Sequence, residues 1–95
     1  MIKIGLNGFG RIGRAIMRIT EQTNDCEIVA INEIDPDVGN AAYLLHYDSV
    51  YGRFKGDVSS NGSTLIINDR KVKMYSDLNC LDVPWEKHNV DVLID

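Results

Sequence analysis

The sequence is poor in the residues that mark secreted, metal-binding and membrane proteins. It has only two cysteines, Cys26 and Cys80, with no CxxC pair and no cluster of histidine and acidic residues around either. Neither a disulfide framework nor a zinc site is therefore expected, and both cysteines are interpreted as ordinary thiols. No apolar run approaches the roughly 20 residues of a membrane span, and no signal-peptide core follows the first residues. We therefore expect a cytoplasmic protein.

Clusters of basic residues are also absent. The chain has 10 Lys and Arg against 14 Asp and Glu, a formal net charge of -4, and the basic residues are scattered. A surface for nucleic acid or anionic membrane needs clustered cations, so both partners are excluded. The remaining composition, 44% hydrophobic and 25% charged, is typical of a globular domain. Its 95 residues allow at most one small domain.

Hydrophobic periodicity predicts two strand–helix units at the start of the chain. Ile2–Asn7 is an apolar run followed by a glycine, which is typical of a buried strand. Cys26–Ile31 is a second apolar run and predicts a second strand. A helix is predicted from Gly10 to about Thr23. A second helix is predicted to open at Asp35–Pro36, because Asp caps a helix and Pro is tolerated in its first turn. The predicted buried faces are Ile12, Ala15, Ile16 and Ile19 in the first helix, and Val38, Ala41, Ala42 and Leu45 in the second.

The second half of the chain has shorter segments separated by turn residues. Asn61-Gly62 lies between Asp57-Val58 and Thr64–Ile67, and Asn68-Asp69 precedes Val72–Tyr75, which predicts an antiparallel excursion. Pro84-Trp85 indicates a loop or short helix, and a last buried strand is predicted at Val90–Asp95.

This order of elements predicts an α/β fold: the first βαβαβ half of a Rossmann-type, doubly wound parallel sheet with a small antiparallel β insert. The last predicted strand has no helix after it to cover the sheet. We therefore expect residues 1–95 to be a truncated, N-terminal part of a nucleotide-binding domain. The alternative is a complete short chain that binds a nucleotide or a partner without catalysis.

A glycine motif follows the first predicted strand. Gly8, Gly10 and Gly13 form G-x-G-x-x-G at the start of the first helix. In a dinucleotide-binding fold the first glycine makes the tight turn, the second lets the pyrophosphate approach the backbone, and the third allows close packing of helix and strand. The free N–H groups and positive end of the helix then face the phosphates. A bare glycine motif is weak evidence, because glycines at helix starts are often only turn residues.

An acidic residue stands where this fold needs one. Glu33 follows Gly13 by twenty residues and closes the second predicted strand. A carboxylate there accepts hydrogen bonds from the adenine ribose hydroxyls. It would repel a ribose 2′-phosphate, and its neighbours Asn32 and Ile34 offer no cation. NAD is therefore predicted as the cofactor in preference to NADP, with a solvated strand-end charge as the alternative role for Glu33.

Three longer motifs resemble a known family. They are Gly5–Arg14, Val29–Glu33 and Tyr47–Phe54, and together they resemble the phosphorylating, NAD-dependent glyceraldehyde-3-phosphate dehydrogenases. The first motif is more specific than its glycines alone, because dinucleotide binding in general does not require Asn7, Phe9, Arg11 or Arg14. The resemblance extends over the whole chain.

The resemblance implies a set of cofactor-binding residues. Residues matching Arg11 and Ile12 meet the pyrophosphate through backbone amides, and the residue matching Glu33 holds the adenosine ribose. The complete expected set is Asn7, Gly8, Phe9, Gly10, Arg11, Ile12, Gly13, Glu33 and Leu78. The family usually has Asp in place of Glu33, often has Arg in place of Leu78, and commonly has His in place of Tyr51. The first difference also resembles erythrose-4-phosphate dehydrogenases, and the second leaves only a backbone contact at the adenine site.

The same resemblance implies a chemistry whose catalytic groups lie elsewhere. In the family a Cys thiolate attacks the aldehyde of a sugar phosphate, a His acts as base and hydride passes to NAD. The matching Cys and His lie beyond residue 95, and neither Cys26, Cys80, His46 nor His88 matches them. No catalytic residue is therefore assigned, and these 95 residues alone are expected to be inactive. The resemblance also implies a homotetramer.

Overall fold

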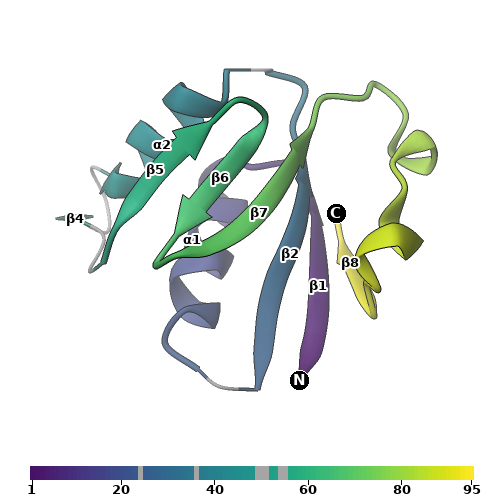
Figure 1. Cartoon of the computed structure of the whole chain (residues 1–95), viewed down its shortest axis with the longest axis horizontal. Helices are drawn as coiled ribbons and strands as arrows, with labels where there is room; N and C mark the ends of the chain where they lie inside the picture. Colours follow the sequence, from purple (N-terminus) through teal and green to yellow (C-terminus); the bar gives the residue numbers. More distant parts are fainter. Residues whose placement is uncertain (24, 36, 49–51, 54–55) are drawn as a thin grey trace.

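The computed structural model describes residues 1–23, 25–35, 37–48, 52–53 and 56–95 (Figure 1). Its main feature is a six-stranded sheet in the order β5-β6-β7-β2-β1-β8. The strands are β1 (Ile2–Asn7), β2 (Cys26–Asn32), β5 (Val58–Asn61), β6 (Thr64–Ile67), β7 (Arg70–Tyr75) and β8 (Val92–Ile94). A separate two-stranded pair is formed by β3 (Tyr47–Asp48) and β4 (Gly52–Arg53).

The sheet has a parallel half and an antiparallel half. β1 pairs in parallel with both β2 and β8, and β2 pairs in parallel with β7. β5, β6 and β7 pair antiparallel. The predicted α/β class and antiparallel insert are therefore confirmed, but the insert is not separate, because its last strand is also the third strand of the parallel half. β2 and β7 follow β1 along the chain and lie on one side of it in the sheet. β8 comes later in the chain and lies on the other side of β1.

Both α-helices lie on one face of the sheet (Figure 1). α1 (Arg11–Thr20) and α2 (Val38–His46) enclose the core with side chains of β1, β2, β6 and β7. On β1, Ile4 and Leu6 point into this core, so Gly5 between them faces the other way. The Trp85 ring lies there, because a Cβ on Gly5 would be 2.8 Å from it. Trp85 belongs to the second of two 3₁₀ segments, η1 (Cys80–Asp82) and η2 (Trp85–His88).

The buried face predicted for α1 is only partly confirmed, because Ile16 packs against the core and Ile12 and Ile19 do not. Ile12 and Ile19 are 77% and 62% exposed, whereas the buried positions are Gly13, Met17 and Thr20. A Cβ on Gly13 would lie 2.6 Å from the Gly8 carbonyl oxygen, so the helix contacts the glycine loop along the row that begins at Gly13. That contact orients the helix on the loop, with Ile16 partly buried against the core and Ile12 and Ile19 exposed. α1 also ends three residues earlier than predicted, at Thr20.

The buried face predicted for α2 is confirmed, and its start is corrected. Val38, Ala41, Ala42 and Leu45 are all buried. The N-cap is Asp37 rather than Asp35: the Asp37 side chain accepts a hydrogen bond from the Asn40 N–H at 2.9 Å. Asp35 instead accepts from the Asp37 N–H at 3.0 Å and so forms the turn before the helix. Pro36, which the sequence also places at the helix start, lies outside the described residues.

The two predicted hairpin turns are confirmed. Asn68 and Asp69 connect β6 to β7 with φ of 50° and 69°, the positive values that a tight two-residue hairpin turn requires. Gly62 follows β5 with φ of 62°. The last strand differs more from prediction. β8 lies at an edge of the sheet, and Val92 and Leu93 are 46% and 41% exposed, so it is not the buried strand expected for Val90–Asp95.

Candidate nucleotide-binding site

The candidate site lies at the carboxyl ends of the parallel strands. The strand order reverses at β1, with β2 on one side and β8 on the other. In open α/β sheets ligands bind in the crevice beyond the carboxyl ends at such a point. Gly8 directly follows β1 and Glu33 directly follows β2. Gly8 and Glu33 line one cavity of about 180 Å³ together with Leu78, from the loop after β7.

The three motif glycines differ in geometry, and each geometry fits the role predicted for it. Gly8 has φ of 111°, a backbone conformation that side chains with a Cβ rarely adopt. Gly10 has no atom within 4 Å of where its Cβ would be, so there is open space above it. Gly13 is in tight contact with the Gly8 carbonyl. The loop therefore combines a tight turn, room for a ligand at the backbone and close packing of helix and strand.

The first turn of α1 faces this open space. The helix begins at Arg11, and its N-cap, Gly10, has no side chain to bond the first N–H groups. The amides of Arg11 and Ile12 come before the first intrahelical bond, in which the Arg14 N–H donates to the Gly10 carbonyl at 2.9 Å. No acidic residue in this turn offsets the positive end of the helix. The exposed Ile12 side chain packs on no core residue, so its amide is what it can offer a phosphate.

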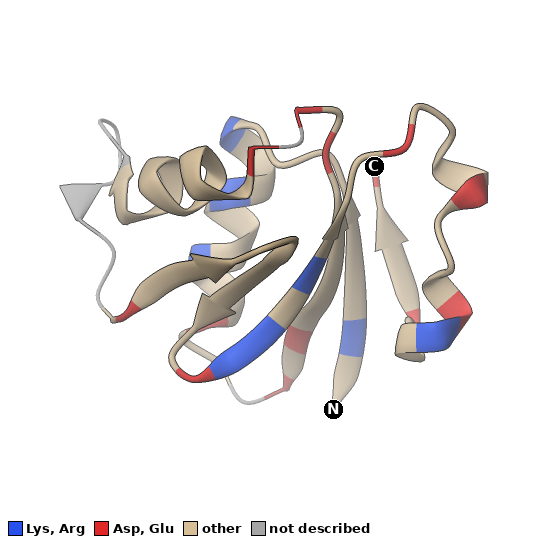
Figure 2. Cartoon of the chain, turned by 45° about the horizontal axis from the view of Figure 1, so that its top comes forward, with Lys and Arg blue, Asp and Glu red and all other residues tan. Residues whose placement is uncertain are grey.

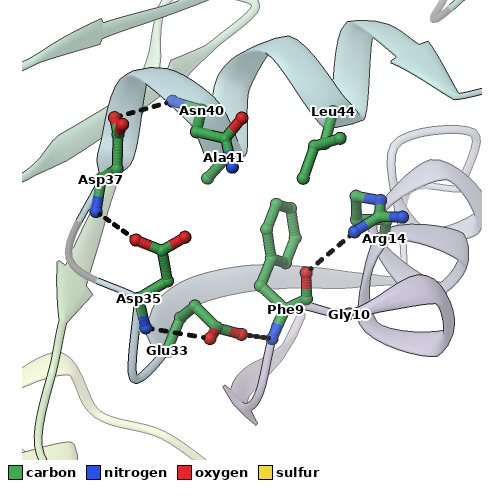
Figure 3. Close-up of a pocket in the computed structure, with 9 residues that line it drawn as sticks. All are labelled: Phe9, Gly10, Arg14, Glu33, Asp35, Asp37, Asn40, Ala41 and Leu44. Carbon is green, nitrogen blue, oxygen red and sulfur yellow. Dashed lines mark hydrogen bonds between the residues drawn. The ribbon is translucent and has the colours of Figure 1, made fainter.

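Phe9 connects the glycine loop to the core. Its side chain is only 4% exposed and lies beside Leu44 and Ala41 of α2 (Figure 3). Its N–H donates to Glu33 Oε1 at 2.8 Å, and its carbonyl accepts from the Arg14 guanidinium at 3.3 Å. Phe9 therefore fixes the loop by packing and by its backbone.

Glu33 is held from two sides. Oε1 accepts from the Phe9 N–H, and Oε2 accepts from the Asp35 N–H at 3.1 Å (Figure 3). A carboxylate has about four acceptor positions, so these two bonds leave room for two more. Glu33 lines the 180 Å³ cavity, and it also lines a second one of about 210 Å³ between the glycine loop and α2. The carboxylate is thus oriented by the backbone and still available to hydroxyl donors.

Two aliphatic side chains border the cavity near Glu33. Ile34 is 64% exposed and Leu78 is 87% exposed. They come from the loops after β2 and β7, which the Ser76 hydroxyl joins by donating to the Ile34 carbonyl at 2.8 Å. Exposed aliphatic side chains that line a cavity suit the flat apolar faces of a base. The sequence indicated Leu78 only through resemblance and did not indicate Ile34.

Asn32 is a residue of the site that the sequence did not reveal. Its side chain is 4% exposed and joins the ends of β1 and β2 to the loop after β7. The Asn7 side chain takes part, since it accepts from Asn32 at 2.9 Å and donates to Asp95 at 3.0 Å. The only signal in the sequence was an asparagine at a strand end before an acid, which is also typical of an ordinary turn.

Negative charge gathers at this edge of the sheet. Figure 2 shows acidic residues in the loops at the carboxyl ends of the strands, and the cavities there are lined by Glu33, Asp35, Asp37, Asp77 and Asp95. Arg14 lines the same cavity as Glu33, Asp35 and Asp37, and Arg11 lines the same cavity as Asp95. Carboxylates therefore outnumber guanidinium groups around Glu33. An additional phosphate on the ribose would meet this negative charge.

Within the described ranges, no group of three or more His, Cys, Asp and Glu side chains is placed to hold a metal ion. Cys26 contacts Thr23 at 3.6 Å, and Cys80 offers its carbonyl to the Trp85 ring N–H at 3.0 Å. His88 bonds to the Tyr75 hydroxyl at 2.7 Å. None of these residues lines the cavities at the glycine loop.

Comparison with known proteins agrees with this geometry. Residues 2–95 match the family described as glyceraldehyde 3-phosphate dehydrogenase, NAD binding domain. The chain belongs to this family. NAD is therefore its cofactor, as the sequence predicted.

The curated relatives bear the same name. The chain is 42% identical over 95 residues to glyceraldehyde-3-phosphate dehydrogenase 1 of Kluyveromyces lactis, and 44% identical to its namesake from Kluyveromyces marxianus. It is 42% identical to the cytosolic glyceraldehyde-3-phosphate dehydrogenase of Trypanosoma brucei brucei. All of the chain is covered in each case, but it spans only 29%, 29% and 28% of these relatives. Their names do not favour the erythrose-4-phosphate alternative.

Two of the differences from the usual glyceraldehyde-3-phosphate dehydrogenase pattern can be located in the structure. Glu33 keeps its carboxylate at the end of β2, where it bonds to the glycine loop. Leu78 lines the same cavity as Glu33 and carries no charge. Tyr51, and much of the Tyr47–Phe54 motif around it, lies outside the described residues. No described helix is long and apolar enough to span a membrane.

Proposed function

We propose that this chain holds the adenosine and pyrophosphate part of NAD, with the glycine loop on the phosphates and Glu33 on the ribose. The observation that carries the proposal is the bond between Glu33 Oε1 and the Phe9 N–H at 2.8 Å. It places the acid directly beside the loop whose open space at Gly10 can receive a phosphate. Asn7, Gly8, Phe9, Gly10 and Gly13 form the frame of the site. Arg11, Ile12, Glu33 and Leu78 make its contacts.

The phosphates would be held by backbone amides. Those of Arg11 and Ile12 lie at the positive end of α1, and a phosphate above Gly10 meets no side chain. The guanidinium groups of Arg11 and Arg14 line the neighbouring cavities and add positive charge. This arrangement would orient the pyrophosphate.

The ribose would be held by Glu33. Its two remaining acceptor positions suit two hydroxyl donors, and Asp35 and Asp37 add negative charge nearby. A 2′-phosphate in place of a hydroxyl would both lose a donor and meet repulsion. The site therefore favours NAD over NADP.

For the whole protein we propose the phosphorylating oxidation of glyceraldehyde 3-phosphate, in the cytoplasm and as a homotetramer. The names of the relatives support the substrate, and that of the trypanosome relative supports the location. Residues 1–95 are proposed to be the N-terminal part of its NAD-binding domain and inactive alone. NAD accepts the hydride when bound. This chain contributes binding and orientation, while the nucleophile and base belong to residues outside it.

Replacing Glu33 with Gln tests the ribose assignment. Gln keeps an acceptor oxygen for the Phe9 amide but removes the charge. Because charge-assisted hydrogen bonds are the stronger ones, we expect the Kd for NAD to rise about tenfold. The Kd for NADP should change less or fall, so the NAD/NADP preference shrinks. Calorimetric titration of both cofactors measures this.

Asp35→Asn is the matched control, because it removes the same charge from the same cavity and keeps the acceptor for the Asp37 amide. We expect it to change the Kd for NAD by about twofold or less, as befits a screened surface charge. Equal effects of the two substitutions on the Kd for NAD would show that only the total negative charge near the cavity matters, and not the position of Glu33. Unchanged NAD and NADP binding in Glu33→Gln would refute the role of Glu33.

A further inference from the structure

Asn32 is the most deeply connected polar side chain at the site. Among the described residues only Thr20 and Asn32 are polar and buried, and Thr20 bonds within its own helix. Asn32 instead bonds to two other segments of the chain. A buried amide is stable only when its donors and acceptor are satisfied, so the partners of Asn32 show what it holds.

The Asn32 side chain pairs with the backbone of Asp77 as a neighbouring strand would. Its Oδ1 accepts from the Asp77 N–H at 2.8 Å, and its Nδ2 donates to the Asp77 carbonyl at 3.0 Å. The second Nδ2 hydrogen goes to Asn7 Oδ1 at 2.9 Å. Both donors are therefore used within the protein, and the amide has no hydrogen left for a cofactor.

The backbone of Asn32 also bonds to the glycine loop. Its carbonyl accepts from the Gly8 N–H at 2.6 Å, at the turn that begins the glycine loop. One residue thus connects Gly8 on one side with Asp77 on the other. Leu78 comes next along the chain and, at 87% exposure, has little packing of its own. Its position follows from how Asp77 is held.

We propose that Asn32 is a positioning residue that holds Leu78 at the cavity it lines together with Ile34, and so sets the affinity of the site for the adenine base. The inference rests on the proposed function. Ser76 complements it, because its hydroxyl donates to the Ile34 carbonyl at 2.8 Å and so joins the two walls at a second point. Without the Asn32 bonds, the loop that carries Leu78 keeps the Ser76 bond to Ile34 but loses both bonds at Asp77. The base then loses one apolar wall, while the phosphate and ribose contacts remain.

The experiment compares two ligands in the purified protein: ADP, and ribose 5′-diphosphate, which lacks the base. Asn32→Ala removes all three side-chain bonds without burying a charge. We expect the Kd for ADP to rise about tenfold, and that for ribose 5′-diphosphate to change by less than about twofold. Titrations followed by NMR measure both and show whether the variant is folded.

Asn79→Ala is the matched control. It makes the same change on the other side of Leu78 and removes one bond, from the Leu81 N–H at 3.0 Å, without touching Asn32. It should leave both dissociation constants unchanged. An equal loss for both ligands in Asn32→Ala, or no loss for ADP, would overturn the inference alone. Failure of the unmodified protein to bind ADP would overturn the proposed function as well.

A second measurement does not depend on the variant folding. In the unmodified, ligand-free protein the Asp77 amide hydrogen should exchange as slowly as those of β2, because it is bonded to a buried side chain. Exchange of Asp77 as fast as that of an exposed loop amide would show that Asn32 does not hold this loop, and would overturn the inference.

Discussion

The two sides of the nucleotide site are built in different ways. The phosphate side, residues Gly8–Gly13, is one continuous segment fixed by backbone contact, with a Cβ on Gly13 only 2.6 Å from the Gly8 carbonyl oxygen. The adenine side, Ile34 and Leu78, comes from two loops and consists of exposed side chains. The phosphate side therefore has no room to adjust where the helix meets the loop at Gly13. The adenine side depends on hydrogen bonds between distant segments.

The difference shows which parts of the site are separable. A change at Gly13 must disturb the packing of α1 on the glycine loop, so binding and folding are coupled at that position. A change on the adenine side alters contacts with the ligand and little else, because Leu78 packs on almost nothing. Substitutions on the two sides should separate stability from affinity.

Gly13→Ala should have the largest effect. The added methyl would meet a backbone oxygen, which cannot move aside as a flexible side chain could. We expect a loss of about 2 kcal/mol or more in the free energy of unfolding, together with weaker NAD binding. This is a large share of the stability of a small domain. Denaturant unfolding measures the change.

Gly10→Ala is the control on the same loop. Its methyl meets nothing within 4 Å, and its φ of -79° suits any residue. It should leave the unfolding free energy within about 0.5 kcal/mol of the unmodified value, because it creates no clash, yet weaken NAD binding by obstructing the phosphate. Similar destabilisation by both substitutions would contradict the packing assigned to Gly13.

Leu78→Ala should have an intermediate effect, confined to binding. The side chain loses contact area with the base, and we expect the Kd for ADP to rise about fivefold with the unfolding free energy unchanged. Leu81→Ala is the control, since Leu81 is equally exposed, at 87%, but does not line the cavity. Fluorescence-detected titration of both variants compares them. Equal weakening by the two would show that Leu78 makes no specific contact.

The sequence predicted the phosphate side better than the adenine side for a physical reason. The glycine spacing encodes a local turn and helix start, so Gly8, Gly10 and Gly13 could be assigned roles from six adjacent residues. Glu33 followed from its place at a strand end. Asn32 and Asp77 are 45 positions apart, and nothing local indicates that they pair.

The helices show the same limit. For α2 the apolar spacing alone gave the buried face, because the core covers that face fully. For α1 the spacing predicted Ile12, Ala15, Ile16 and Ile19, but of the isoleucines only Ile16 packs against the core, and the helix meets the glycine loop at Gly13. A glycine carries no hydrophobic signal, so a helix oriented by a glycine contact is misjudged by periodicity. The contact between Gly13 and Gly8 therefore orients the helix in a way that the hydrophobic spacing of the sequence does not indicate.

Lowering the pH should have the smallest effect on stability. It acts through a contact of β7, the strand that precedes the loop of Leu78. His88 bonds to Tyr75 of β7, and burial, together with the charges of Lys87 and Lys73, lowers the pKa of His88 below its ordinary value of 6.5. The unfolded chain then takes up the proton first, so stability is fully present above about pH 6.5 and falls as the pH drops toward the folded pKa. His88→Gln should remove this part of the pH dependence. Denaturant unfolding of both proteins between about pH 7 and pH 5 measures it, and parallel curves would show that the Tyr75–His88 contact carries no protonation-linked stability.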